Sequence, residues 1–309
     1  MLPASPLGCG ASPGANDNFP AEAPMTTPKI ALVTDTDASL PREVAARYRI
    51  WQVPIMVHFG DESLRAVYDL DDAATFARIR QEGRLPTTAA PAPGQFVDAF
   101  LEAFEQGAEQ VLCFTVSSKV SATWKAAQAA RAMLPQRDIT VVDTRSLSIG
   151  EGFMVLAAAE AVAAGASVAE AIAAAEWTRE HTHLYAALAT LKYLAMSGRV
   201  SHMVAKMAGA LNIRPILTIK DGELALLEKA RTRRKAWQRV LALARQHVGE
   251  RPPQRLSILH INAPEEARAF EKILCEAIPC PEERLYAELT PGLSVHAGEG
   301  LVGVAFVAE

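Results

Sequence analysis

The chain has 309 residues, of which 50% are hydrophobic and 21% charged, and this length predicts two domains or one large one. Its 31 Lys and Arg residues against 35 Asp and Glu residues give a net charge of −4. A general nucleic-acid-binding protein is therefore not expected, because such proteins carry a basic excess. The longest apolar runs, such as residues 153–159, are far shorter than the roughly 18 residues that span a bilayer. We expect a soluble, cytoplasmic protein.

The first 28 residues differ in character from the rest. They are rich in Pro, Ala, Gly and Ser and lack a periodic apolar pattern, which predicts a disordered N-terminal extension over residues 1–28. No basic segment followed by an apolar one precedes Cys9, so a secretory or lipoprotein signal is not expected. Because Met25 stands just before the first strand-like run, translation from Met1 or from Met25 stays open.

From residue 29 to about residue 170, short β-rich runs alternate with longer helical ones. The expected strands cover residues 30–34, 50–59, 109–116 and 139–142. The expected helices cover residues 40–47, 71–81, 94–106, 121–133, 153–164 and 168–179. Strands separated by helices of this length predict right-handed crossovers and a parallel sheet. We therefore expect an α/β domain over residues 29–170.

The remaining residues predict a different arrangement. The expected strands cover residues 184–190, 213–220, 223–229, 255–261 and 301–307, and the expected helices cover residues 191–196, 237–248 and 265–277. Asp221-Gly222, between two of the strands, is the strongest hairpin signal in the chain. A hairpin with further strands and helices predicts an α+β domain with a mixed sheet over residues 171–309. The fold class is thus α/β with two domains.

Two carboxylates follow the first expected strand. Asp35 and Asp37 have the spacing that a phosphotransferase of the haloacid dehalogenase type requires, one as nucleophile and the other as general acid. Such an enzyme also needs carboxylates at a later strand end to bind Mg²⁺, whereas Asp221 is the only aspartate after residue 190. The plainer interpretation is that Asp35 and its polar neighbours cap the next helix. A Mg²⁺-dependent phosphotransferase or phosphatase is kept as the alternative function.

Other motifs carry less weight. Residues 298–303 match the dinucleotide-binding pattern G-x-G-x-x-G, but a strand rather than a helix is expected after them. Four cysteines are too few and too irregularly spaced for a disulfide framework, and Cys275 and Cys280 do not form a C-x-x-C motif. His181 and His183 are too few for a metal site. We expect neither a metal nor a cofactor.

Hydroxyl-rich segments stand where expected elements meet. Thr87 and Thr88 lie in a Pro-rich segment predicted to be a loop before a helix, and residues 117–123 connect a strand to a helix. Loops beyond strand ends are where open α/β sheets bind ligands, and helix N-termini favour anions. Neutral hydroxyls at such places suit a carboxylate without demanding catalysis. A serine hydrolase that uses Ser118 or Ser121 with His296 ranks last, because no nucleophile elbow is present.

The order of these segments, from Lys29 to Glu309, resembles the DegV family of bacterial fatty-acid-binding proteins. The pieces that carry the resemblance are Thr34-Asp35-Thr36, Leu40-Pro41, Val53-Pro54-Ile55, Pro86-Thr87-Thr88, Gly94, residues 117–123, Val141-Val142-Asp143, residues 197–201, residues 211–215, Asp221-Gly222, Arg231-Thr232 and residues 296–300. Each piece is weak alone, but together, in this order and at plausible spacing, they are specific.

The resemblance implies two α/β domains that bury one long-chain fatty acid such as palmitate. It places the carboxylate of the acid at Thr88 and Ser121, and it places Thr87, Ser118 and His296 near the same head group. No catalytic residue is implied. The bound acid is the ligand, and the chain itself is expected not to be an enzyme.

The family also implies a partner. A fatty acid kinase phosphorylates the bound acid to an acyl phosphate, and Arg199 and Arg231 match positions expected to contact that kinase or a phosphate. Transient membrane contact is compatible with this role. Departures from the family pattern occur at Ala89-Ala90, Ala122, Ser197 and Ala297, where the family commonly has Ser-Gln, Gly, Gly and Thr. Acyl length, oligomeric state and the existence of the kinase do not follow from the sequence.

Overall fold

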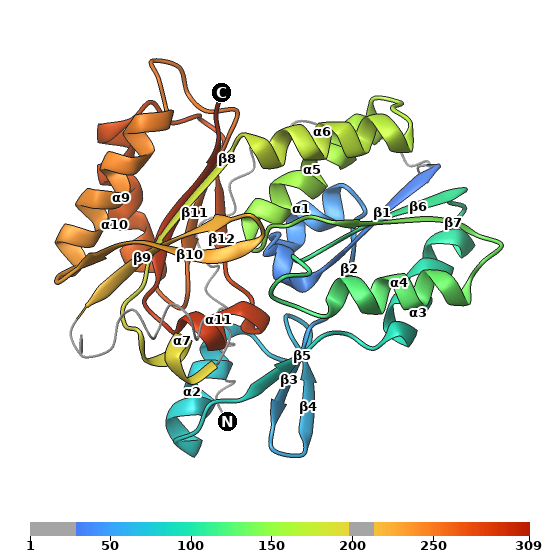
Figure 1. The fold of residues 1–309 in the computed structure, drawn as a ribbon, viewed down its shortest axis with the longest axis horizontal. Helices are drawn as coiled ribbons and strands as arrows, with labels where there is room; N and C mark the ends of the chain where they lie inside the picture. Colours follow the sequence, from blue (N-terminus) through green and yellow to red (C-terminus); the bar gives the residue numbers. More distant parts are fainter. Residues whose placement is uncertain (1–28, 198–212) are drawn as a thin grey trace, which may run out of the picture.

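The structure, a computed structural model, describes residues 29–197 and 213–309 and contains three β-sheets within this part of the chain (Figure 1). The N-terminal extension predicted for residues 1–28 lies outside the described residues. The two larger sheets stand side by side, and helices lie on their outer faces and between them (Figure 1).

The first sheet comes from the first half of the chain and is entirely parallel. Its strands have the order β2-β1-β6-β7, with bounds Trp51–Val53, Ile30–Asp35, Gln110–Thr115 and Asp138–Asp143. All six residues of β1 are buried, as expected for a strand covered on both faces. Helices α3 (Pro93–Glu105) and α4 (Thr123–Met133) cover the outer face, where Phe96 and Phe100 are buried in a core that they share with Ala127. The predicted parallel sheet is confirmed.

The second sheet comes from the second half and is mixed, as predicted. Its order is β10-β9-β8-β13-β11-β12, with bounds Glu223–Ala230, Arg214–Lys220, Thr182–Ala187, Val302–Val307, Arg255–His260 and Leu285–Glu288. Only β11 and β12 pair in parallel. Asp221 and Gly222 form the β9–β10 turn with φ of 52° and 84°, the left-handed conformation that tight hairpins require. Helices α9 (Arg233–His247) and α10 (Pro264–Ala277) cover the outer face.

A shared helical layer joins the two sheets. It contains the short helix η1 (Thr36–Ala38), α1 (Arg42–Arg47), α5 (Ile149–Ala163) and α6 (Val168–Glu180). The largest apolar core runs through this layer, and it includes Leu32 of β1, Phe153 of α5, Leu184 of β8 and Leu259 of β11. Because this core is continuous across residue 170, the division into domains at that residue stays a prediction.

The third sheet corrects one expectation. Its order is β4-β3-β5, with bounds Glu62–Arg65, Met56–Phe59 and Thr87–Ala89, and α2 (Asp72–Glu82) stands between β4 and β5 in the chain. Thr87 and Thr88, predicted to lie in a loop, therefore form part of a strand, paired with His58 and Val57. Strand geometry sends neighbouring side chains to opposite faces, so Thr87 is exposed whereas Thr88 points inward.

Helix α7 (Lys192–Ser197) was predicted from the sequence. Helix α11 (Pro291–Ala297) and strand β12 were not predicted. The sequence predicted no disulfide framework, and it did not indicate the single pair that forms. Helix α10 ends at Ala277, and the turn that follows brings the Cα atoms of Cys275 and Cys280 to 5.4 Å, where they form a disulfide. Cys113 is a buried free thiol.

Candidate functional site

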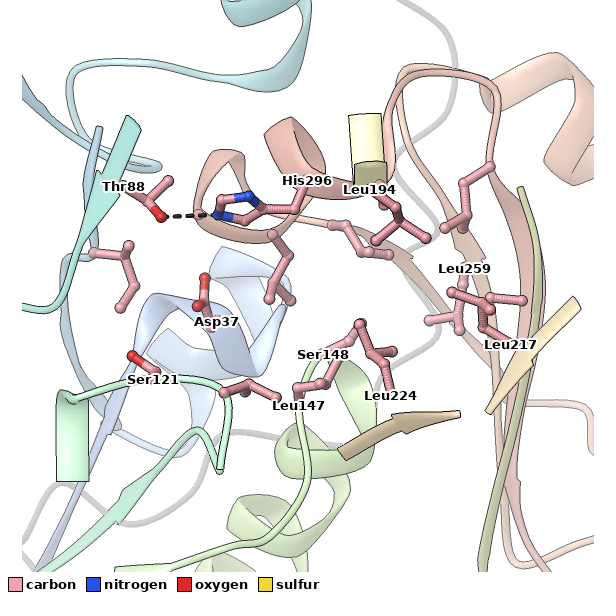
Figure 2. A pocket seen from close by; sticks show the side chains of 18 of the residues that line it. Asp37, Thr88, Ser121, Leu147, Ser148, Leu194, Leu217, Leu224, Leu259 and His296 are labelled. Carbon is pink, nitrogen blue, oxygen red and sulfur yellow. Dashed lines mark hydrogen bonds between the residues drawn. The ribbon is translucent and has the colours of Figure 1, made fainter. Parts of the chain in front are cut away.

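A cavity of about 340 Å³ lies between the second sheet and the segments that follow the strands of the first sheet (Figure 2). This volume falls within the range of small-molecule sites. Most of its wall is apolar, and ten of the lining residues are leucines: Leu147, Leu184, Leu188, Leu194, Leu217, Leu224, Leu259, Leu289, Leu293 and Leu301. The polar residues of the wall are Asp37, Thr88, Ser121, Ser148 and His296.

The inner face of the second sheet forms one side of the apolar wall, and leucines of α7, α11 and the loops form the rest. Along β8, Leu184 and Ala186 face the cavity, whereas Tyr185 and Ala187 face the outer core under α9 and α10. This alternation follows from the two-residue period of a strand. Leu217 of β9, Leu224 of β10 and Leu259 of β11 extend the same face, so that one sheet supplies a continuous hydrocarbon surface.

Most of the polar side chains of the wall, among them Thr88, Asp37 and Ser121, lie toward the opposite end, whereas Ser148 lies nearer the leucines (Figure 2). Thr88 of β5 and His296 of α11 meet there, with 2.8 Å between Thr88 Oγ1 and His296 Nε2. If Nε2 carries the proton, the imidazole donates to Thr88, whose own hydroxyl can then donate to a ligand oxygen. The two side chains are 208 residues apart in the sequence, and the fold brings them together.

Ser121 reaches the same cavity from the loop that precedes α4. Its Oγ lies 2.8 Å from Thr123 Oγ1 and accepts a hydrogen bond from the Thr123 backbone N–H at 3.3 Å. Ser121 is half-buried, and its neighbours Val120 and Ala122 also line the cavity. The structure thus brings Thr88, Ser121 and His296 to one cavity.

The other predicted site residues lie elsewhere. Ser118 is not in the cavity wall: its hydroxyl donates to Asp143 Oδ2 at 2.5 Å, and its backbone N–H donates to Asp143 Oδ1 at 3.0 Å. Thr87 is exposed on the opposite face of β5. Arg231 is exposed just before α9, and Arg199 lies outside the described residues.

Asp35 is not placed to act as a nucleophile. Its side chain is fully buried, and its two oxygens accept hydrogen bonds from the backbone N–H groups of Asp37 and Val116 at 2.9 and 2.8 Å. Burial raises the pKa of the Asp35 carboxyl to about 7, although both hydrogen bonds lower it. Asp35 is absent from the cavity wall, so the geometry does not favour the phosphotransferase.

Asp37 plays a different part, because it does line the cavity. Its Oδ1 accepts a hydrogen bond from Thr290 Oγ1 at 3.3 Å, across 253 residues of sequence. Among residues 29–197 and 213–309, no group of three or more His, Cys, Asp or Glu side chains is arranged to hold a metal ion.

The serine hydrolase is not supported either. His296 bonds to Thr88 through Nε2, Ser121 bonds to Thr123, and Ser118 bonds to Asp143. Within the described residues, neither Ser118 nor Ser121 forms a hydrogen bond with His296, whereas a nucleophile and its base need one.

The fold and the cavity define a class of protein: an α/β protein with two large sheets and one small one that encloses an apolar cavity with polar groups toward one end. The family model that matches residues 29–309 carries the description of an uncharacterised protein of the DegV family. The chain belongs to the DegV family.

Relatives of known family match this chain over most of its length and almost all of their own. A DegV domain-containing protein of Streptomyces coelicolor is 33% identical over 275 residues, which cover 89% of this chain and 97% of the relative. Protein DegV of Bacillus subtilis is 30% identical over 278 residues, covering 90% and 98%.

Solved structures give the same result. A DegV family protein from Thermus thermophilus, described for its fatty acid binding, has a TM-score of 0.81 at 31% identity and covers 91% of this chain and 99% of its own. DegV from Bacillus subtilis, described as a fatty acid binding protein, has a TM-score of 0.82 at 28% identity, covering 91% and 100%. No helix within the described residues is long and apolar enough to cross a membrane.

Part of the site was not predicted from the sequence. Asp37 was interpreted as a catalytic acid or a helix cap, and Ser148 and the leucines of the second sheet were not selected. The alternation of Leu184, Ala186 and Leu188 was a usable signal, because it marks one face of a strand. Thr290-Pro291 likewise has the residue types of a helix start and indicated α11.

Proposed function

We propose that the protein binds one long-chain fatty acid, such as palmitate, in this cavity. The acyl chain lies along the leucine wall, and the carboxylate lies at Thr88 and Ser121 with His296 beside it. The observation that carries the proposal is the Thr88–His296 pair at one end of a cavity otherwise lined mainly by leucine. The similar proteins from Thermus thermophilus and Bacillus subtilis, both described as binding fatty acids, support it.

The energetics divide between the two ends of the cavity. Burying about 15 carbons of a C16 chain gains roughly 12 kcal/mol at about 0.8 kcal/mol per methylene. Immobilisation of the ligand and ordering of side chains consume several kcal/mol of that gain. The apolar wall therefore supplies most of the affinity. An unpaired buried carboxylate is heavily disfavoured, so the hydroxyl donors are needed to permit binding and to fix its direction.

The role that fits this site is presentation rather than catalysis. The bound acid is then the substrate of a fatty acid kinase, which forms the acyl phosphate. The chain then acts as a cytoplasmic, non-enzymatic carrier that exchanges its ligand by transient contact with a membrane. Arg199 and the exposed Arg231 are the proposed contacts to the kinase or to a phosphate. No metal or cofactor takes part in the binding.

Lipid analysis tests the binding proposal. Native mass spectrometry of the tag-free protein, with extraction of its ligand, is expected to show one long-chain fatty acid per chain. The double variant Thr88→Ala/Ser121→Ala is expected to bind palmitate at least tenfold more weakly, since it removes two donors to a charged group. Thr218→Ala is the matched control, because Thr218 lies on β9 outside the cavity wall. Unchanged palmitate affinity in the double variant would overturn the head-group assignment.

Reconstitution tests the role in presentation. With a fatty acid kinase and ATP, the loaded protein is expected to yield acyl phosphate, and neither component alone is expected to do so. Arg199→Ala and Arg231→Ala are expected to slow acyl-phosphate formation while the bound lipid stays at one per chain. Acyl phosphate formed by the carrier alone would contradict the non-enzymatic role.

A further inference from the structure

Helix α11 belongs to the second half of the sequence, yet it packs against elements of the first half. It contacts α2, β3 and η1 as well as α7. Four of its seven residues, Gly292, Leu293, His296 and Ala297, line the cavity. The position of this short helix therefore decides where His296 stands relative to Thr88 on β5.

Two acidic residues of the first half of the chain, Asp72 and Asp37, form hydrogen bonds with residues of α11 or its N-cap. Ser294 donates its hydroxyl to Asp72 Oδ1 at 2.5 Å, and the two residues are only 0% and 2% exposed. Asp72 is the first residue of α2 and is absent from the cavity wall. Its second oxygen, Oδ2, has no hydrogen-bond partner in the described part of the chain. Burial of a carboxyl oxygen without a hydrogen-bond partner is unfavourable, and Asp72 lies outside the cavity wall. Its contact with Ser294 therefore points to a role in holding α11.

The second carboxylate secures the start of the helix. Thr290 precedes α11 as its N-cap residue, but its side chain forms no capping bond and donates to Asp37 Oδ1 instead. Gly292 lies so close to this carboxylate that a Cβ atom on it would stand 2.2 Å from Asp37 Oδ1. The helix is thus fitted to the first half along its length.

We propose that Asp72 and Ser294 are a positioning pair that fixes α11 and thereby holds His296 in register with Thr88. Successive helical residues are rotated by about 100°, so Ser294 and His296, two residues apart, point in different directions on one rigid element. Ser294 faces Asp72 of α2 while His296 faces the cavity. The effect on ligand affinity rests on the proposed function; the effect on the Thr88–His296 hydrogen bond does not.

A set of variants isolates the pair. Asp72→Ala and Ser294→Ala are each expected to weaken palmitate binding about tenfold, and the double variant is expected to be no weaker than either, because the two residues act as one unit. Asp72→Asn keeps the acceptor for Ser294 and is expected to stay within about twofold of the wild type. Asp98→Ala, an exposed acid on α3, is the matched control.

The decisive readout is the imidazole of His296, followed by ¹⁵N NMR in the ligand-free protein. Asp72→Ala and Ser294→Ala are expected to change its ring-nitrogen shifts and its titration, whereas Asp72→Asn restores the wild-type spectrum. A purely structural role would lower the unfolding temperature and leave the His296 spectrum of the folded protein unchanged, which would overturn the proposal. Ser294→Ala removes one hydroxyl only and keeps the test decisive if Asp72→Ala does not fold. Absence of palmitate binding in the wild type would defeat the proposed function, and the spectra would still decide the positioning role.

Discussion

The two ends of the cavity are built in different ways. The apolar wall has one face of the second sheet as its continuous part, where strand geometry repeats an inward side chain at every second residue, and leucines of neighbouring loops and helices complete it. The polar end is assembled from separate segments: β5, η1, the loop before α4, and α11. A sheet face tolerates the exchange of one apolar side chain for another but not a buried charge, whereas an assembled end depends on how its segments are held. Substitutions at the two ends test this difference, from the largest expected effect to the smallest.

The largest effect is expected at the apolar wall. Leu217→Asp places a carboxylate on the inner face of β9, in the wall proposed to contact the acyl chain. It is expected to reduce palmitate affinity by more than about 100-fold, because burial of an unpaired charge is strongly unfavourable. Thr218→Asp is the matched control on the next residue, which points to the other face of the sheet. Isothermal titration with palmitate, beside a circular dichroism spectrum to verify folding, measures the difference. Equal affinities for the two folded variants would show that the wall does not contact the ligand.

Two fully buried carboxyl groups of the first half of the chain, those of Asp35 and Glu151, predict that the stability of the protein depends on pH. The pKa of Asp35 is about 7 in the folded protein against 3.8 for the ordinary group, mainly through burial. Between these values the folded state holds a proton that the unfolded state has lost, so the free energy of unfolding falls as pH rises from about 4 to about 7. We expect this contribution to be on the order of a few kcal/mol.

Urea denaturation at several pH values measures this slope. Asp35→Asn removes the titrating group and is expected to flatten the fall between pH 4 and 7, even though it also loses an acceptor for one of the two backbone N–H groups. Glu151, whose fully buried carboxyl has a pKa raised well above 4.5 by burial, is expected to keep part of the slope in that variant. An identical slope in the wild type and in Asp35→Asn would refute the assignment.

The contact between α11 and η1 gives a smaller effect. Gly292→Ala puts a methyl group 2.2 Å from Asp37 Oδ1, so one of the two segments has to move. We expect a loss of roughly 2 kcal/mol in the free energy of unfolding, in the range of overpacked cores, together with weaker palmitate binding. Gly94→Ala on α3 is the control, because a Cβ atom there meets nothing within 4 Å. Chemical denaturation of both variants decides, and equal stabilities would mean that α11 is not closely fitted to η1.

The sequence predicted the regular elements better than the assembled site. All strands of the two large sheets except β12, and most helices, were predicted from apolar periodicity and turn residues, including the Asp221-Gly222 hairpin. Strand β5 was not predicted, because Thr87 and Thr88 follow a proline and the strand has only three residues. Its partner β3 lies about 30 residues earlier, and no local pattern reveals that pairing.

The polar end shows the same limit. Family resemblance selected Thr88, Ser121 and His296, and the structure places them in one cavity. The hydrogen bond between Ser294 and Asp72, on the other side of α11, could not be predicted, because the two residues are 222 positions apart and neither belongs to a motif. Such contacts depend on tertiary packing, which a single sequence does not display.

The smallest effect is expected where the two large sheets meet. Ser117 Oγ donates to the backbone carbonyl of Gly222 at 2.7 Å and joins the loop before α4 to the β9–β10 hairpin. Ser117→Ala leaves that carbonyl without this donor, so we expect a loss of about 1 kcal/mol in the free energy of unfolding. We also expect faster hydrogen exchange in β9 and β10, with less than about threefold change in palmitate affinity, because the apolar wall stays intact. Ser63→Ala, an exposed serine on β4, is expected to stay within about 0.5 kcal/mol of the wild type. A loss of affinity as large as that of Leu217→Asp would instead place the junction of the sheets, rather than the leucine wall, at the centre of ligand binding.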